Sequence, residues 1–475
     1  MWYDSPMTQI DQADTFITSL GLEAYRVGGS VRDEVLGRRA KDADYMVRGS
    51  NLPEVRKRLM LAAHLKFTKY NCSSLKLRDE RTVGCRFYGA GMGTIEVALP
   101  RTEVSTGPGR QDFEIVVDPA LSLEQDSCRR DFTFNALYKL MPGGPVSDPT
   151  GAGLHDLQHK LIRTTHEDSF RDDPLRTLRA LRFVSTLGFD VSRNTVEQMQ
   201  KHAESVTGLT QKGVSGTVLD ELSKLLMGAD CARALRLARD TGVLAVLLPE
   251  LAAMLGFDQG SRYHDLTTDE HTFKALETAA HVDAPLRVRL ALLFHDAGKP
   301  AAAWTGKDGR KHYYANDEGS RDHEVEGSEL WLAAAQRLNV PSALRKDVNT
   351  LILNHMVPVR PKVKSTVVRR QRVQLGDELL KDLFLMRSCD LTGKGKKVAL
   401  DHIHHIAMLE KVRKAAADEN VPCSIRELNI NGNEVKALGF VGRDIGRVLN
   451  TLLDEVACNP KLNDHEWLIS RAGEL

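Results

Sequence analysis

Two acidic residues, Asp42 and Asp44, stand two positions apart just before the apolar run Tyr45-Met46-Val47. On a strand, this spacing places both carboxylates on one face. Two carboxylates so close together repel each other unless a cation lies between them, and Mg²⁺ held by carboxylates and substrate phosphates meets that condition. A solvated acidic turn is the alternative reading of the same residues. The pair therefore predicts either a magnesium site or an exposed loop.

A glycine pair precedes these acids. Gly28 and Gly29, followed by Ser30, connect a strand-like segment to a helical one. Backbone N–H groups at such a helix N-terminus can surround phosphate oxygens, although a plain strand-to-helix connection would use the same residues. Glycines and acids together resemble the pattern of the nucleotidyltransferase superfamily. That superfamily often has a third carboxylate, for which Glu96 is the candidate here, with an exposed strand residue as the alternative.

A longer motif makes the resemblance specific. The segment 129–136 reads RRDFTFNA, which closely resembles the RRDFTINA motif of class II tRNA nucleotidyltransferases, the CCA-adding enzymes, and of bacterial poly(A) polymerases. Phe134 replaces the isoleucine of that motif. Segments 148–157 and 172–183 resemble the DPxxGxxDL and EDPLRxLRAxRF motifs of the same family, with Asp172 in place of the usual glutamate. The order of these motifs makes coincidence a poor explanation.

The third of these segments contains a carboxylate and a guanidinium that could read a nucleobase. Asp173 and Arg176 are three apart and, on a helix, share one face. A carboxylate accepts from the exocyclic amino group of cytosine or adenine, while a guanidinium donates to the adjacent ring nitrogen. Uracil and guanine present the opposite polarity there. The alternative is an ordinary surface salt bridge, which contributes little stability.

The resemblance also implies roles for individual residues. Asp42 and Asp44 would hold Mg²⁺ and, with Glu96, form the catalytic set. Asp131 would support the site of the incoming nucleotide. The segment 101–113 looks like a flexible loop that is shortened in relatives adding only CC, which favours a full CCA enzyme. The implied nucleotide-binding residues are Gly28, Gly29, Ser30, Arg32, Arg130, Asp131, Asp173, Arg176, Arg179 and Arg182.

A second constellation of potential metal ligands lies further along the chain. The segment 292–300, LLFHDAGKP, resembles the HD-domain signature LLHDxGKP. Imidazoles combined with carboxylates suit Ni²⁺, Mn²⁺, Co²⁺ or Fe better than Mg²⁺ alone. Such a site normally activates water against a phosphoester. A packed helix residue is the alternative for any single histidine. The predicted ligands are His271, His295, Asp296, His323, His355 and Asp390.

The elements that must position these residues divide the chain in two. Strand-like segments alternate with one helical segment, 52–65, as far as about residue 140, whereas helical spacing of apolar residues dominates from about residue 170 onward. We therefore predict an α+β protein: a polymerase-β-like α/β nucleotidyltransferase head followed by an all-helical neck, body, HD domain and tail. The predicted boundaries are 1–153 for the head, 154–267 for neck and body, 268–417 for the HD domain and 418–475 for the tail.

Composition excludes several classes of protein. The 475 residues are 42% hydrophobic and 27% charged with a net charge of +1, which argues against disorder and against a global electrostatic attraction to nucleic acid. The seven scattered cysteines predict reduced thiols and a cytoplasmic location. No apolar run is long enough for a membrane span.

These observations predict a CCA-adding tRNA nucleotidyltransferase that uses CTP, ATP and tRNA, with a fused metal-dependent phosphohydrolase domain. One alternative is a poly(A) polymerase or an enzyme adding only CC or only A. Another, from a different class, is an HD phosphohydrolase whose head merely binds RNA. The oligomeric state stays open.

Overall fold

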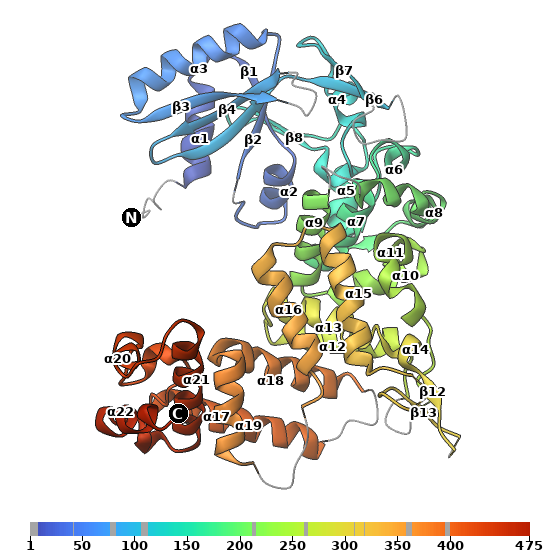
Figure 1. Ribbon diagram of the computed structural model, residues 1–475. Coiled ribbons are helices and arrows are strands. Elements are labelled where there is room, and N and C mark those ends of the chain that lie inside the picture. Colours follow the sequence, from blue (N-terminus) through green and yellow to red (C-terminus); the bar gives the residue numbers. More distant parts are fainter. Residues whose placement is uncertain are drawn as a thin grey trace, which may run out of the picture. The chain divides into compact units, whose positions relative to one another are not determined.

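The computed structural model describes residues 8–40, 42–76, 82–105, 113–210, 215–260, 265–307, 309–317, 319–357, 363–394 and 400–475. The chain forms two compact units (Figure 1). The first comprises Met1–Leu225 and Leu237–Leu247, and the second Leu226–Arg236 and Leu248–Leu475. This division is coarser than the four segments expected from the sequence, whose boundaries stay predictions.

The first unit begins with a seven-stranded sheet in the order β3-β4-β5-β2-β1-β8-β9. Neighbouring strands run antiparallel except for β2 and β5, which are parallel. Strands β6 and β7 form a separate two-stranded hairpin. The strands are β1 (Glu23–Val27), β2 (Asp44–Arg48), β3 (Tyr70–Lys76), β4 (Thr82–Gly89), β5 (Gly93–Ala98), β6 (Arg101–Ser105), β7 (Phe113–Val117), β8 (Tyr138–Leu140) and β9 (Val146–Ser147).

Successive side chains of a strand point to opposite faces of the sheet, so each strand presents apolar residues to one face. Two helices cover that face. Helices α1 (Gln9–Thr18) and α3 (Leu52–Lys66) bury Phe16 and Leu59 against strand residues such as Phe87. Helix α3 starts at a good N-cap, because the side chain of Asn51 accepts from the backbone N–H of Glu54. A smaller cluster including Met46 and Tyr138 fills the other face. The sheet is thereby held rigid beneath the glycine turn and the acidic pair.

The rest of the first unit is helical and joins the sheet through aromatic packing. Phe134 stacks on Phe132 at 5.7 Å between ring centroids and meets Phe183 and Phe189 edge-on at 5.3 and 5.6 Å. A phenylalanine at position 134 therefore fits a cluster of rings. The helices are α2 (Gly29–Val35), α4 (Leu123–Cys128), α5 (Gly153–Gln158), α6 (Ser169–Asp172), α7 (Leu175–Leu187), α8 (Arg193–Lys201), α9 (Ser215–Met227), α10 (Cys231–Asp240) and α11 (Val243–Leu247).

The second unit is a bundle of helices extended by a C-terminal group with its own core of residues such as Leu452 and Leu468. The helices are α12 (Thr268–His281), α13 (Leu286–Phe294), α14 (Lys299–Ala302), α15 (His323–Arg337), α16 (Ser342–Asn354), α17 (Ser365–Leu375), α18 (Asp377–Thr392), α19 (Leu400–Asp418), α20 (Gly432–Ala437), α21 (Arg443–Cys458) and α22 (His465–Gly473). Among the described residues, no helix is long and apolar enough to cross a bilayer.

The α+β prediction is confirmed, but the expectation of a purely helical remainder is wrong in detail. Two pairs of short strands lie beyond residue 153: β10 (Leu161–Ile162) with β11 (Asp190–Val191), and β12 (Trp304–Thr305) with β13 (Lys311–His312). Strands of two residues leave no alternating pattern long enough to recognise in a sequence.

Gly298 allows the start of α15 to approach the end of α13. A Cβ atom at this position would lie 2.3 Å from the carbonyl oxygen of His323 and 2.5 Å from the backbone nitrogen of Gly327, which is closer than contact permits. Both neighbours are backbone atoms and cannot rotate away. The glycine of the HD-like motif is therefore required by packing rather than by backbone conformation.

We expect Gly298→Ala to lower the free energy of unfolding by about 1–3 kcal/mol, the usual effect of overpacking. The matched control is Gly446→Ala on the exposed side of α21, where a Cβ meets no atom within 4 Å. That variant should gain up to about 1 kcal/mol, since alanine favours helix over glycine. Urea unfolding of both variants checks the prediction, and changes of equal sign would contradict it.

Candidate functional site

The acidic side chains of the head meet at the paired strands β2 and β5. Asp44 opens β2 and stands directly opposite Glu96 of β5 in the parallel register. Asp42 lies in the irregular residues before the strand and is exposed. Only Asp44 belongs to the strand, but both aspartates are exposed whereas Ala43 between them is buried, as expected for two side chains on one face. Glu96 is supplied by the neighbouring interior strand, 52 positions further along the chain (96 − 44).

The electrostatics of Asp44 reflect this crowding. Removal of the carboxylate from water, followed by the negative charge of Glu96, raises its pKa to about 6, and Asp42 adds to the effect. Arg130 opposes the shift but does not cancel it. A carboxylate with a raised pKa next to two others is a group that a cation would stabilise in its ionised form.

Glu96 has a cationic neighbour across the sheet. Arg86 of β4 is paired with it in register and donates from Nε and Nη2 to its Oε1 at 3.0 and 2.6 Å. Both side chains are accessible to solvent. Glu96 thus faces Asp44 on one side and Arg86 on the other, and its role in the acidic set stays a prediction beside the alternative of an exposed strand residue.

The glycine turn faces the same region. Gly28 has a positive φ of 69° and precedes α2, which begins at Gly29. The hydroxyl of Ser30 donates to the carbonyl of Val27 and fastens the turn. Arg32, one turn into the helix, donates to Asn135 at 3.0 Å and to Asp33 at 2.8 Å. The N–H of Gly28 donates to the carbonyl of Leu137 at 3.3 Å, so the turn is fixed from both sides.

Arg130 is held by groups that the sequence did not single out. Its guanidinium donates to the buried carboxylate of Asp126 at 3.0 Å and to the hydroxyl of Tyr138 at 2.8 Å. Arg129 shares the same carboxylate at 2.8 Å. Burial opposes ionisation of Asp126, but the two arginines outweigh it and keep its pKa well below the ordinary value. Asp126 stands outside the RRDFTFNA motif and takes no part in the Ser122–Gln125 capping box of α4, so the sequence offered no signal for it.

Asp131 connects the head to α7. One oxygen accepts from the backbone of Phe132 and from Asn135, at 2.8 and 3.0 Å. The other accepts from Arg179 at 2.6 Å. Although burial opposes ionisation, Arg179 holds the pKa of Asp131 below its ordinary value.

The predicted triphosphate arginines of α7 share a second acid. Glu221 of α9 lies 3.6 Å from Arg179 and 3.0 Å from Arg182. Their positive charges are thus partly neutralised in this structure. Their proposed contact with a triphosphate stays a prediction.

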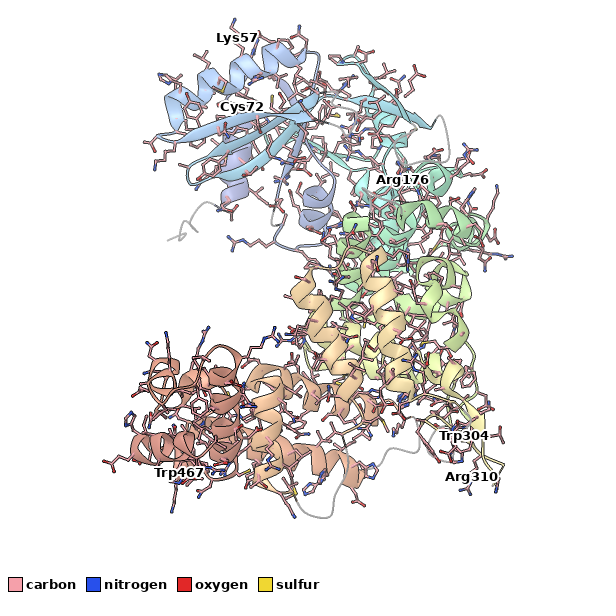
Figure 2. The ribbon with its side chains drawn as sticks, in the orientation of Figure 1. Lys57, Cys72, Arg176, Trp304, Arg310 and Trp467 are labelled. Atoms are coloured by element: carbon pink, nitrogen blue, oxygen red, sulfur yellow. The ribbon has the colours of Figure 1, made fainter. Side chains whose placement is uncertain are left out.

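The predicted base-reading pair differs from the expected geometry. Asp173 does not lie on the helix: its backbone is extended, and its carboxylate accepts from the N–H of Leu175 at 3.0 Å, at the start of α7. Pro174 explains this, because a residue before proline avoids helical backbone, a signal present in the sequence. Arg176 is on the helix and buried, and it donates to Ser169 at 2.9 Å and to the carbonyl of Arg129 (Figure 2).

The donor set of the head fits a divalent cation. Asp42, Asp44 and Glu96 offer only oxygen ligands, as Mg²⁺ prefers, and their mutual repulsion is what such an ion would remove. In this structure their oxygen atoms do not all lie within 4.8 Å of one another, as the ligand atoms around Asp296 do. Of the predicted flexible loop, residues 106–112 lie outside the described residues; its ends belong to β6 and β7.

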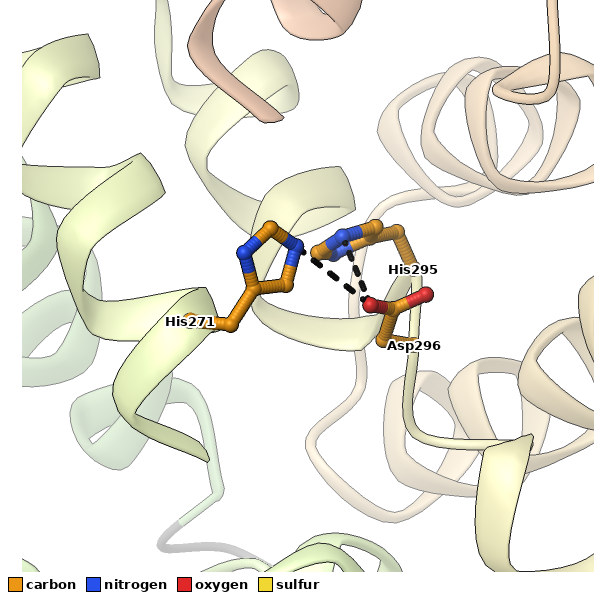
Figure 3. Close-up of side chains that lie close together, drawn as sticks. All are labelled: His271, His295 and Asp296. Atoms are coloured by element: carbon orange, nitrogen blue, oxygen red, sulfur yellow. Dashed lines mark ion pairs between the residues drawn. The ribbon is translucent and has the colours of Figure 1, made fainter. Parts of the chain in front are cut away.

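The second cluster brings together every ligand expected for the HD-like site. His271, His323 and Asp390 belong to α12, α15 and α18, whereas His295 with Asp296 follows the end of α13 and His355 follows the end of α16. Asp296 is its centre (Figure 3). Its Oδ2 lies 3.4 Å from His271 and 3.3 Å from His295, while its Oδ1 lies 3.7 Å from His323 and 3.9 Å from His355. Asp390 approaches the cluster from α18, 2.9 Å from Nε2 of His271.

The histidines are oriented as metal ligands are. In His295, His323 and His355 the Nδ1 atom lies 2.7–3.0 Å from a backbone carbonyl oxygen. Since a carbonyl only accepts, each Nδ1 carries the hydrogen, and each ring directs its Nε2 atom into the cluster, where a metal would bind it in place of a proton. The buried Nε2 of His295 has no hydrogen-bond partner among the described residues. Nε2 atoms of His323 and His355 face each other at 3.3 Å. A cation at this point would be bound by the Nε2 atoms that converge here. The donor atoms of the cluster therefore fit a metal ion.

Charges around the cluster compensate the acids. Lys299 donates to Oδ2 of Asp296 at 2.7 Å, and Arg387 donates to Asp390. Burial opposes ionisation of Asp296, but His295 and then Lys299 hold its pKa well below the ordinary value. Burial by itself would lower the pKa of His295. The negative charges of Asp296 and Asp390 outweigh this effect and raise the pKa to about 9. Lys299 was recognised only as part of the motif, and Arg387 was missed.

A cavity of about 470 Å³ opens onto this cluster. Asp296, His323, His355 and Asp390 form one side of it. The remaining lining includes the cationic side chains Lys299, Arg310, Lys311, Arg387 and Lys394. The arrangement of metal ligands, space and positive charge is suited to a phosphate ester and an attacking water.

Comparisons with known proteins cover both units. A family model described as the Poly A polymerase head domain matches residues 24–163, and one described as a probable RNA and SrmB- binding site of polymerase A matches residues 188–255. The chain is similar over 98% of its length to a CCA-adding enzyme of Bacillus stearothermophilus solved with CTP, at a TM-score of 0.65 and 24% identity. The match also covers 98% of that protein's chain. At 24% sequence identity, this likeness supports the fold alone.

Relatives of higher identity decide the family. A multifunctional CCA protein of Nitrosococcus oceani is 35% identical over 328 residues, which span 68% of this chain and 71% of that protein. Another, from Xanthomonas campestris pv. campestris, is 31% identical over 421 residues, spanning 84% of this chain and 93% of that protein. The resemblance inferred from the motifs is confirmed, and the chain belongs to the family of the multifunctional CCA proteins.

Proposed function

We propose that this chain is a CCA-adding tRNA nucleotidyltransferase, which adds C, C and A from CTP and ATP to the 3′ end of tRNA without a nucleic-acid template. The observation that carries the proposal is the cluster of Asp42, Asp44 and Glu96 around strands β2 and β5 beside the glycine turn. The multifunctional CCA relatives and the CCA-adding structures supply the substrate class. The seven free cysteines favour a reducing, cytoplasmic setting.

The residues of the head divide the work of nucleotidyl transfer. Asp42 and Asp44 would hold Mg²⁺, which would supply positive charge at the phosphates. The tRNA 3′ hydroxyl would attack the α-phosphate, forming the new phosphodiester bond as the bond to the β-phosphate breaks and pyrophosphate leaves. The N–H group of Gly29 would bind a phosphate oxygen at the helix start, whereas the N–H of Gly28 already donates to the carbonyl of Leu137 and holds the turn in place. Arg32 and Arg130 supply positive charge, and their existing hydrogen bonds to Asn135 and Asp126 hold them in place beforehand.

Base selection is proposed for Asp173 and Arg176. Asp173 lies just before α7 and Arg176 in its first turn, and Arg176 is fixed by the carbonyl of Arg129 within the RRDFTFNA motif. A carboxylate and a guanidinium in this place can accept from and donate to cytosine or adenine. Arg179 and Arg182 would exchange part of their contact with Glu221 for the triphosphate.

We expect Asp44→Asn to lower the rate of nucleotide addition at least about 100-fold, because the amide keeps the shape but loses the negative charge that holds the cation. Glu54→Gln, which removes a head carboxylate paired with Arg58 on the surface of α3, is the matched control and should retain the rate. Incorporation of labelled CTP into tRNA lacking its terminus measures both. Addition by Asp44→Asn at the wild-type rate would contradict the assignment.

The raised pKa of Asp44 predicts a pH dependence. Cation binding requires the ionised carboxylate, and protonation below a pKa of about 6 competes with it. The Mg²⁺ concentration for half-maximal addition should therefore be about tenfold higher at pH 5 than at pH 7. An aspartate of ordinary pKa would give a change of less than about twofold, and that result would show that the surroundings of Asp44 do not raise its pKa.

For the helical unit we propose a second activity, metal-dependent hydrolysis of phosphate esters on RNA ends or nucleotides. The specific observation is the convergence of imidazole Nε2 atoms on Asp296 at the wall of a basic cavity. The mixture of nitrogen and oxygen donors favours Ni²⁺, Mn²⁺, Co²⁺ or Fe. A metal bound there would activate water, while Lys299 and Arg387 orient Asp296 and Asp390 and offset their charge.

His295→Ala should remove most of the bound transition metal and the hydrolysis of phosphomonoesters, because a ligand with a fixed ring orientation is lost. CTP and ATP addition should persist. His281→Ala, an exposed histidine on α12, is the matched control and should keep the metal. Elemental analysis after dialysis counts the metal, and thermal melting verifies folding. Metal retained by folded His295→Ala would overturn the ligand assignment.

A further inference from the structure

A short hairpin forms the outer wall of the cavity in the second unit. Strands β12 and β13 pair antiparallel, with Trp304 opposite His312. Figure 2 marks Trp304 and Arg310 on this hairpin. His312 and Tyr314 both line the cavity, as do Arg310 and Lys311. The part of the cavity lining that the hairpin contributes is thus aromatic and basic, and no function proposed above accounts for its rings.

The rings of the wall brace one another. Trp304 packs on His312 at 4.7 Å between centroids and meets Tyr314 edge-on at 5.5 Å. The indole Nε1 also donates to the carbonyl of Tyr314 at 2.9 Å. Tyr314 is nevertheless 53% exposed. A large ring held in position yet left accessible is suited to stacking against another ring.

The hairpin is tied directly to the metal cluster. The carbonyl of Tyr313 accepts from both the backbone N–H and the Nδ1 of His323, each at 3.0 Å. The hydroxyl of Tyr313 donates to the carbonyl of Gln259, whose side chain accepts from Lys299 at 2.7 Å. Lys299 in turn contacts Asp296. The aromatic wall therefore has a defined position relative to the ligands that would hold a scissile phosphate.

We propose that His312 and Tyr314, braced by Trp304, are specificity-determining residues that stack on the nucleobase of a nucleotide whose phosphate ester lies at the Asp296 cluster. The inference rests on the proposed phosphohydrolase. A cavity of about 470 Å³ has room for a mononucleotide, and its cationic lining matches the phosphate charge. Stacking on aromatic side chains is the usual way in which proteins hold a base without reading its sequence.

The test compares two phosphomonoesters, adenosine 3′-monophosphate and glycerol 2-phosphate, with wild type, Tyr314→Ala and Tyr314→Phe in the presence of Mn²⁺ or Ni²⁺. Wild type should prefer the nucleotide, and the ratio of the two kcat/KM values should fall about tenfold or more in Tyr314→Ala. Tyr314→Phe keeps a ring and should keep the ratio. A wild type without preference, or an unchanged ratio in Tyr314→Ala, overturns the inference while hydrolysis of glycerol 2-phosphate still supports the proposed phosphohydrolase.

A binding measurement gives a readout independent of turnover. Adenosine 3′-monophosphate should change the emission of Trp304 in a saturable manner, isolated as the difference between wild type and Trp304→Phe. Tyr314→Ala should raise the apparent Kd of this signal about tenfold, and glycerol 2-phosphate should give none. If wild type hydrolyses neither ester with any metal, the proposed phosphohydrolase fails. If the Trp304 signal is absent, the base-stacking wall is wrong whatever the hydrolysis result.

Discussion

The buried carboxylate of Asp131 holds the nucleotidyltransferase head against the first long helix of the neck. It accepts from Asn135 within its own motif and from Arg179 of α7, and Asn135 also accepts from Arg32 of the glycine-turn helix. One acid thus links the segment that approaches phosphates to the segment proposed to read the base. A buried carboxylate is stable only when its hydrogen-bonding capacity is satisfied. The positions of these arginines therefore depend on one another, and the motifs that contain them act as a single unit.

A second constraint is shared by the two clusters. In the head, carboxylates lie near one another against their own repulsion; in the helical unit, imidazole Nε2 atoms converge on one carboxylate. Neither arrangement is favourable for the polypeptide alone, and in each the rigid surroundings hold it in place. The oxygen donors of the head suit a hard cation, whereas the mixed donors around Asp296 suit a transition metal. The donor sets of the two clusters therefore favour different divalent ions.

The sequence predicted contiguous motifs well and long-range pairings poorly. Helix α7 follows its apolar periodicity from Leu175 to Leu187, and the HD-like motif correctly marked Asp296. The register of Asp44 opposite Glu96 depends on a parallel pairing between distant strands, which periodicity does not encode. Asp173 was placed on a helix that Pro174 forbids it to join. The site roles of all these residues stay predictions.

Features built from isolated residues escaped the sequence reasoning. Asp126 lies outside every motif, yet its carboxylate accepts hydrogen bonds from two arginines of the RRDFTFNA motif. Its complete burial is visible only in the folded chain. The hairpin of β12 and β13 is too short for a strand pattern, yet it forms one wall of a cavity. Such contributions arise from packing between segments, which only the folded chain reveals.

The central claim is ordered CCA addition, and the most direct measurement follows labelled nucleotides onto a tRNA that lacks its three terminal residues. With CTP alone the purified chain should add two cytidines and stop; with CTP and ATP it should add one further adenosine and stop, and UTP and GTP should be rejected. Continued addition of adenosines from ATP alone, or no incorporation of CTP, would contradict the account.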